Sequence, residues 1–162
     1  MIEIVICVLI GIVTLFLWNF IHEMSHVLMA KIVGDVKTWT IKPYPHMHRG
    51  SFRFAGAYWM WKRLPEDKDR GWVYLAPRLP DLLAILAIPA TFLLTGLAKF
   101  ILLIVLAGGI IDLFVGSLGI SDKTDLNKIS RHFAINPWLP RVVGFVISAL
   151  AIAAIVVSIC PF

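Results

Sequence analysis

Four long runs of apolar residues dominate the chain and predict four helices that cross a membrane. They cover residues 4–33, 81–98, 100–120 and 141–160. A helix needs about 20 predominantly apolar residues to cross the hydrocarbon core of a bilayer, and each run reaches roughly that length. So few residues separate the second run from the third that we expect an antiparallel helical hairpin. Pro89 predicts a kink within the second run.

The segment between the first two apolar runs, residues 34–80, has a different pattern that predicts short strands. Apolar and polar residues alternate in KTWTI (37–41) and in SFRF (51–54), which is the period of a strand. We expect a hairpin that turns near Arg49 and Gly50. Aromatic residues of this segment alternate with Lys and Arg, a composition typical of the membrane interface. After the third run, SDKTDLNKISRHF (121–133) predicts a short interfacial helix.

The composition agrees with a membrane protein. Of the 162 residues, 59% are hydrophobic and 15% are charged, and the mean hydropathy is +0.86. A chain with so few charges has too little polar surface for a soluble domain. We therefore predict an all-α integral membrane protein that forms a single membrane domain over residues 1–162. It has four transmembrane helices and a small β-rich interfacial insertion between the first and the second.

The positions of Lys and Arg indicate how the chain is oriented. Fourteen of the 15 lie between residues 31 and 78 or between residues 123 and 141, and Lys99 is the exception. Because positively charged loops stay in the cytoplasm, both termini are expected on the outside. The same rule explains the net charge of +5 without a nucleic acid, so we expect a lipid bilayer and no nucleic-acid partner.

Polar residues inside the first apolar run predict a metal site. Ionisable residues are costly in a membrane helix and usually mark function. Here His22, Glu23 and His26 form the pattern HExxH. Residues four apart lie on one face of a helix, so the two imidazoles can hold one Zn2+ ion, and Glu23 can serve as general base. The structural alternative is a polar group that is hydrogen-bonded to neighbouring helices.

A third metal ligand is expected on another helix, because catalytic zinc takes three protein ligands. The best candidate is Asp112, since it and His26 both lie on the order of 10 Å from the cytoplasmic ends of their helices. Gly108 and Gly116, one turn on either side of Asp112, would let another helix approach that face closely. Other candidates for the third ligand are His46, His48, Asp122 and Asp125.

Together these features resemble the site-2 proteases, a family of intramembrane zinc metalloproteases. The similar part covers about residues 10–125: a core helix with HExxH, a loop with strand character, a helical hairpin and an Asp on a later helix. The resemblance implies zinc ligands at His22, His26 and Asp112, a catalytic Glu23, and an active site toward the cytoplasm. The family usually has Asn and Pro before the ligand Asp and Gly after it. This chain reads LAGGIIDLF and resembles more the small, divergent zincin peptidases of prokaryotes.

The expected activity is zinc-dependent hydrolysis of peptide bonds in membrane-spanning substrates, with one Zn2+ per chain, in a multi-pass protein of a prokaryotic cell membrane. Asn19, one turn before His22, is expected either to orient water or substrate or to cap a polar seam. The predicted strand is expected to hold an extended substrate by β-augmentation through Ser51, Phe52, Arg53 and Phe54. The alternative functions are a metal transporter, a metal-sensing membrane protein, and an inactive relative that binds membrane partners.

Overall fold

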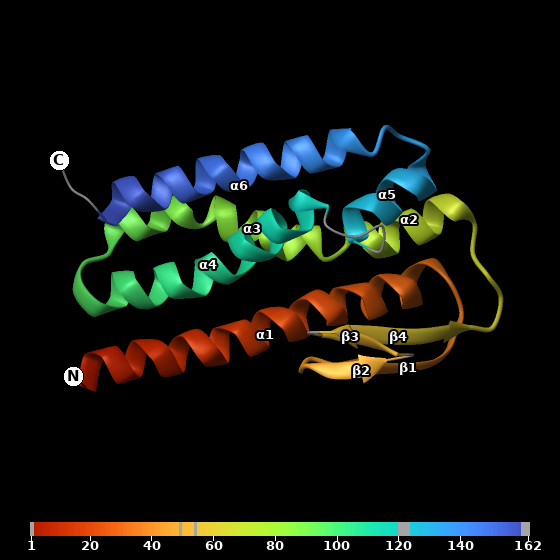
Figure 1. Ribbon diagram of the computed structural model, residues 1–162, viewed down its shortest axis with the longest axis horizontal. Coiled ribbons are helices and arrows are strands. Elements are labelled where there is room, and N and C mark those ends of the chain that lie inside the picture. The colour runs from red at the N-terminus through yellow and green to blue at the C-terminus, as the bar shows by residue number, and fades with distance from the viewer. Residues whose placement is uncertain (1, 49, 54, 120–123, 160–162) are drawn as a thin grey trace.

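The computed structural model of the protein describes residues 2–48, 50–53, 55–119 and 124–159 and is mostly helical (Figure 1). Its helices are α1 (Ile2–Val33), α2 (Asp67–Leu75), α3 (Arg78–Leu86), the 3-10 helix η1 (Ile88–Leu93), α4 (Gly96–Leu118), α5 (Asp125–Phe133) and α6 (Trp138–Ile159). The strands are β1 (Val36–Lys42), β2 (His46–His48), β3 (Ser51–Arg53) and β4 (Gly56–Trp61).

Four helical stretches are long and apolar enough to cross a membrane, judged by length and composition. They are Ile4–Val33, Asp67–Leu93, Gly96–Leu118 and Trp138–Ile159. The predicted mostly helical architecture with a small strand-containing insertion is therefore confirmed. Three of the stretches agree with the predicted helices to within a few residues. The second differs, since it begins at Asp67 and ends at Leu93, whereas the sequence predicted residues 81–98.

The second stretch starts before the predicted residue 81 because tertiary packing stabilises α2, whose sequence DKDRGWVYL is partly charged. Gly71 and Val73 are buried, and Phe133 of α5 packs against α2 so closely that a Cβ at position 71 would lie 2.7 Å from its ring. The stretch is also not one continuous helix. Pro77 separates α2 from α3, and Pro89 lies at the start of η1, where the predicted kink takes the form of a 3-10 turn.

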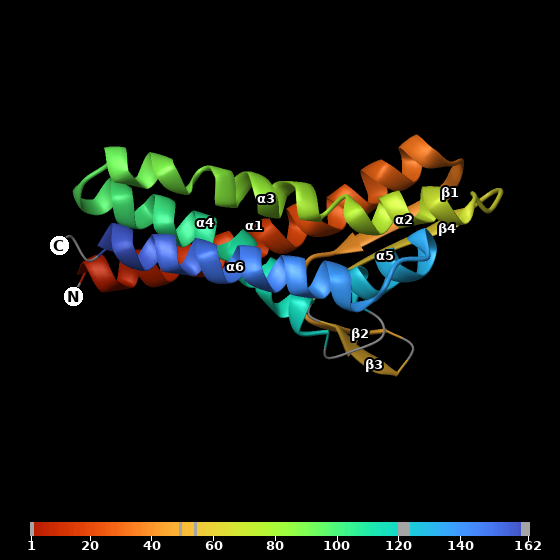
Figure 2. The same cartoon turned by 90° about the horizontal axis from the view of Figure 1, so that it is seen from above.

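The long helices lie side by side and share one core. The beginning of α1 and the end of α6 lie at one end of the molecule, and the strands lie with α2 and α5 toward the other (Figures 1 and 2). Buried apolar side chains from α3, η1, α4 and α6 form the core: Ala84, Ile88, Leu106, Ile110 and Ala151. At the C-terminal end of α4, Gly119 adopts a left-handed conformation with φ of 60° and terminates the helix.

The insertion after α1 forms two small antiparallel sheets. β1 pairs with β4, and β2 pairs with β3 as a hairpin between them, with His48 opposite Ser51. Gly50 in the turn has φ of 75°, a conformation that favours glycine. The predicted strands and the turn at this position are thus confirmed, although Arg49 itself lies outside the described residues. Both β1 and β4 pack along the second half of α1.

One close contact joins α1 to α4 near the middle of both helices. The indole of Trp18 donates a hydrogen bond of 2.6 Å from Nε1 to the carbonyl of Val105. Its ring covers Gly108 so closely that a Cβ at this position would lie 1.8 Å from Cδ1 of Trp18. As expected from the sequence, a small residue on this face of α4 permits the close approach of another helix. This contact brings the face with Asp112 toward the HExxH helix.

We expect Gly108→Ala to lower the midpoint of thermal unfolding of the detergent-solubilised protein by several degrees. The hydrogen bond to Val105 prevents the indole from moving aside, and overpacking typically costs about 1–3 kcal/mol, or about 2–4 °C per kcal/mol at this chain length. Gly11→Ala is the matched control, because a Cβ at this helical glycine meets nothing within 4 Å. Equal midpoints for the two variants would contradict the close contact.

Candidate metal centre

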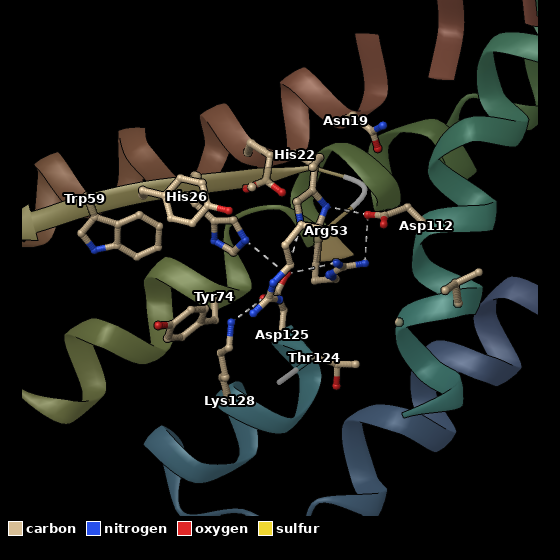
Figure 3. A pocket seen from close by; sticks show the side chains of 18 of the residues that line it. Asn19, His22, His26, Arg53, Trp59, Tyr74, Asp112, Thr124, Asp125 and Lys128 are labelled. Carbon is tan, nitrogen blue, oxygen red and sulfur yellow. Dashed lines mark hydrogen bonds and ion pairs between the residues drawn. The ribbon is translucent and has the colours of Figure 1, made fainter. Parts of the chain in front are cut away.

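Three donor atoms from α1 and α5 converge on one point (Figure 3). The Nε2 atom of His22 lies 3.0 Å from Oδ2 of Asp125, and the Nε2 atom of His26 lies 3.2 Å from the same oxygen. All three donor atoms lie within 4.8 Å of one another. The spacing of the histidines places both on one face of α1, as the HExxH pattern predicted, and α5 presents Asp125 to that face.

The other ring nitrogen of each histidine is also engaged. The Nδ1 atom of His26 lies 2.7 Å from the carbonyl oxygen of Val73, and Nδ1 of His22 lies 2.6 Å from Oδ2 of Asp112. A carbonyl oxygen only accepts hydrogen bonds, so Nδ1 of His26 must carry the hydrogen. In a neutral imidazole, Nε2 then carries a lone pair, and that lone pair faces the carboxylate of Asp125.

Lone pairs that face a carboxylate repel it unless a cation lies between them. Either each imidazole takes a second proton, or a metal ion occupies the point where the three atoms converge. The donor set fits zinc, for which neutral histidine and carboxylate are ordinary ligands. Ligand atoms about 2.0–2.1 Å from a tetrahedral zinc ion lie about 3.3 Å from one another, close to the two separations from Asp125. Outer hydrogen bonds to a carboxylate and a carbonyl complete a typical metal-binding histidine pair.

The structure brings Asp112 to the site, but not to the position that the sequence predicted for it. Its carboxylate contacts Nδ1 of His22, the outer nitrogen of that ring. Asp125 contacts Nε2 of both histidines, the inner nitrogens of the site. The similar depth of Asp112 and His26 in their predicted helices correctly placed Asp112 beside the HExxH helix, since α1 and α4 pack together there. Depth alone does not determine which ring nitrogen the carboxylate reaches. That depends on the position of α5, on which the sequence offered Asp125 only as one of several alternatives.

A buried arginine that the sequence analysis did not single out connects the acidic residues of the site. Arg78 of α3 is 5% exposed, and its Nη1 lies 2.8 Å from Asp81 and 3.3 Å from Asp112. Its Nη2 lies 3.5 Å from Asp125. The signal was present in the sequence, because Arg78 and Asp81 stand three residues apart at the start of an apolar run. Both are buried within the helix bundle.

The surroundings of Asp125 favour its ionised form. Burial by itself raises the pKa of the Asp125 carboxyl. When the imidazoles are protonated, the charge of His26 and hydrogen bonds from His22 and His26 outweigh burial and hold that pKa well below its usual value. Asp125 also lies in the first turn of α5, where the helix dipole favours a negative charge. Lys128, one turn later, places its Nζ 3.5 Å from the carboxylate. An ionised carboxylate is the form that binds metal.

Tyr74 of α2 holds α5 against the histidine helix. Its ring makes an edge contact with His26 at 5.8 Å between centroids and stacks on His132 of α5 at 5.5 Å. Lys128 lies over the same ring at 4.4 Å from the centroid. This aromatic contact explains how a short polar helix can present a metal ligand at a fixed position. It also gives His132 a packing role between α2 and α5.

The candidate metal ligands line a cavity of about 490 Å³ that also contains other predicted site residues. Glu23 and Asn19 of α1 line it, and so do Phe52 and Arg53 of β3. Ser51 pairs with His48 through the backbone of β3, while Phe54 lies outside the described residues. The segment Ala55, Gly56 and Ala57 adds small residues to the wall.

The other candidates for the third ligand do not join this cluster. His46 makes a hydrogen bond of 2.6 Å with the hydroxyl of Tyr58, and His48 stacks on the Tyr58 ring at 4.0 Å between centroids. Neither lines the cavity, although Tyr58 does. Asp122 lies outside the described residues. Within the part of the chain that the structure describes, the group that could hold a metal is therefore His22, His26 and Asp125.

No family model matches the chain, and no curated protein or solved structure matches it either. The resemblance to the site-2 proteases therefore rests on the HExxH motif and its sequence context. What the site can do chemically follows from its own atoms, which present two imidazoles and an ionised carboxylate on one side and Glu23 in the same cavity.

We expect Asp125→Asn to abolish stoichiometric zinc binding, because it removes the carboxylate that both inner nitrogens face. Asp112→Asn should retain zinc at roughly 10–100-fold lower affinity, the usual effect of losing an outer hydrogen-bond partner of a ligand. Both expectations are checked by the zinc content per chain, measured by inductively coupled plasma mass spectrometry during titration with a chelator. Asp35→Asn is the control, since the Asp35 side chain is 62% exposed and pairs with Lys62. Loss of zinc from Asp112→Asn but not from Asp125→Asn would restore Asp112 as third ligand.

Proposed function

We propose that the protein is a zinc-dependent intramembrane peptidase that hydrolyses peptide bonds of membrane-spanning substrates. One observation carries the proposal: the Nε2 atoms of His22 and His26 face a single oxygen of Asp125, while both outer nitrogens are already engaged. This arrangement suits a metal ion, and Glu23 lies beside the first histidine in the same cavity. A metal-binding group next to a carboxylate in a cavity is what a hydrolytic zinc site needs.

His22, His26 and Asp125 would hold one Zn2+ per chain, and zinc in such a site polarises a carbonyl group and activates water at neutral pH. The carboxylate of Glu23 would take a proton from the attacking water and deliver it to the leaving amine nitrogen. Asp112 would keep the His22 ring in the tautomer that leaves Nε2 unprotonated. Asn19 lines the cavity one turn before His22 (Figure 3) and in this proposal would orient water or the substrate backbone; the alternative is that it caps a polar seam.

Exposed apolar side chains support the membrane location. Large apolar residues face outward along the long helices, for example Ile4, Leu9 and Leu150, which are 68%, 57% and 67% exposed. A surface of this kind is suited to lipid rather than to water. The two basic segments of the sequence lie at the end of the bundle away from the start of α1. By the positive-inside rule, this end and the metal centre face the cytoplasm.

The neighbouring strands support a peptide substrate. A helical substrate must unwind before hydrolysis, since its carbonyl groups are otherwise hydrogen-bonded within the helix. The described part of β3 pairs on one side with β2 and leaves its other edge without a strand partner. Phe52 and Arg53 of this strand line the cavity. An extended segment of substrate could therefore pair with the strand while its scissile bond lies near the metal centre.

We expect Glu23→Gln to retain about one zinc ion per chain while it lowers the rate of peptide cleavage by about 10²–10⁴-fold, the usual contribution of a general base. The assay uses a panel of labelled single-span peptides in detergent micelles, with products identified by mass spectrometry. Glu66→Gln is the matched control, because Glu66 is exposed at the start of α2. It should cleave at the wild-type rate.

Three outcomes would contradict the proposed peptidase mechanism. If Glu23→Gln loses its zinc, Glu23 is a metal ligand, as in a transport pathway. If zinc-loaded wild type and Glu23→Gln both fail to cleave every peptide of the panel, the site binds metal without hydrolysis. If wild type cleaves and Glu23→Gln cleaves at the same rate, Glu23 is not the general base.

A further inference from the structure

The charges around the metal cavity differ in how well they are paired. Among the described residues, three carboxylates and three basic side chains line the cavity: Glu23, Asp112 and Asp125, and Arg53, Arg78 and Lys128. Arg78 contacts several acidic side chains, with distances of 2.8–3.5 Å to three carboxylates. Lys128 lies 3.5 Å from Asp125 and over the ring of Tyr74. Arg53 has no carboxylate partner among the described residues.

The side chain of Arg53 belongs to the interior of the cavity. It is half-buried, comes from β3 and extends over the site (Figure 3). It acts on the same neighbour as the proposed base. Burial raises the pKa of the Tyr58 hydroxyl, the charge of Arg53 lowers it, and the charge of Glu23 raises it. Arg53 of β3, Glu23 of α1 and Tyr58 of β4 line the same cavity, close to where substrate would be hydrolysed.

Metal binding, which this inference takes from the proposed function, changes the charge of the cavity. The described lining residues are balanced, with equal numbers of carboxylates and basic groups. A divalent ion would add two positive charges to this balance. With the guanidinium of Arg53, which has no carboxylate partner among the described residues, the loaded cavity favours an anionic group. The planar guanidinium of arginine suits a carboxylate particularly well, because it can donate two parallel hydrogen bonds.

We propose that Arg53 binds an acidic side chain of the substrate, so that the enzyme selects extended segments with Asp or Glu close to the scissile bond. The cavity position favours a peptide over a lipid headgroup, since Arg53 shares one cavity with the metal ligands and with Phe52 of the same strand. A substrate segment that pairs with β3 and reaches the metal centre must pass this guanidinium. Arg53 is thus a specificity-determining residue, distinct from the groups that carry out hydrolysis.

Binding rather than cleavage tests the proposal. The protein is zinc-loaded Glu23→Gln in nanodiscs of zwitterionic lipid, and the probes are fluorescent single-span peptides with acetylated and amidated ends. Glu, Gln or Lys is placed in turn at each position of the flank that faces the basic end of the bundle. We expect Glu to increase affinity about 10-fold or more over Gln at one or two adjacent positions. Adding Arg53→Gln should abolish this preference, and Arg53→Glu should turn it into a preference for Lys.

The control variant and the zinc content separate recognition from folding. Arg63→Gln removes an exposed arginine just after β4, outside the cavity, and should leave the preference for Glu unchanged. Every variant should keep its zinc. Equal affinities for Glu and Gln peptides at all positions would overturn the proposal, as would a preference that survives Arg53→Gln. A preference for Glu that appears only in nanodiscs with anionic lipid, together with weaker binding of that lipid by Arg53→Gln, would also overturn the proposal. Arg53 would then bind a lipid headgroup.

The same peptides distinguish the failure of this inference from the failure of the proposed function. If they bind with a preference for Glu that depends on Arg53, but wild type cleaves none of them, recognition stands and hydrolysis does not. If wild type cleaves them all at rates that ignore the acidic residue, hydrolysis stands and recognition by Arg53 is wrong.

Discussion

Two imidazoles on α1 face one carboxylate oxygen on α5, an arrangement that is favourable only with a second proton on each imidazole or a metal ion between the three groups. The rest of the site is built around that requirement. The carbonyl of Val73 on α2 and the carboxylate of Asp112 on α4 fix the outer nitrogens of the two rings. Side chains or backbone groups of four helices, α1, α2, α4 and α5, thus meet around the two imidazoles. The strands then bound the cavity from the side where an extended chain would enter.

The buried guanidinium of Arg78 makes this density of acidic groups possible. It lies between Asp81, Asp112 and Asp125, and its own burial would be costly without them. Each partner comes from a different helix, so the arginine also fixes how far apart α3, α4 and α5 lie. Removing one partner would leave a charge buried without compensation, which is more destabilising than the pair is stabilising. At this end of the bundle, the ion pairs of Arg78 therefore also determine how the helices pack.

The sequence predicted the parts of the molecule that depend on local pattern. Apolar runs located the long helices, the alternation in SFRF located a hairpin strand, and the spacing of HExxH placed two histidines on one face. For the acidic residue at their Nε2 atoms it favoured Asp112, whereas Asp125 faces those atoms in the structure. Asp112 is conspicuous because it stands in an apolar run, whereas Asp125 looks like an ordinary residue of a polar helix. Only the packing of α5 on α2, through Tyr74 and His132, decides between them.

The position of Asp125 in the chain has a consequence for biosynthesis. A nascent chain that has emerged only as far as α4 carries both histidines and Glu23, but it lacks the carboxylate that completes the centre. The site forms once α5 has been synthesised and has docked on α2, with α6 still to follow. Under the proposed function, the last metal ligand is translated late, so the hydrolase would stay incomplete during insertion, when unfolded segments of its own chain and of its neighbours lie within reach. The order of residues along the chain would thereby prevent hydrolysis before the chain has been inserted.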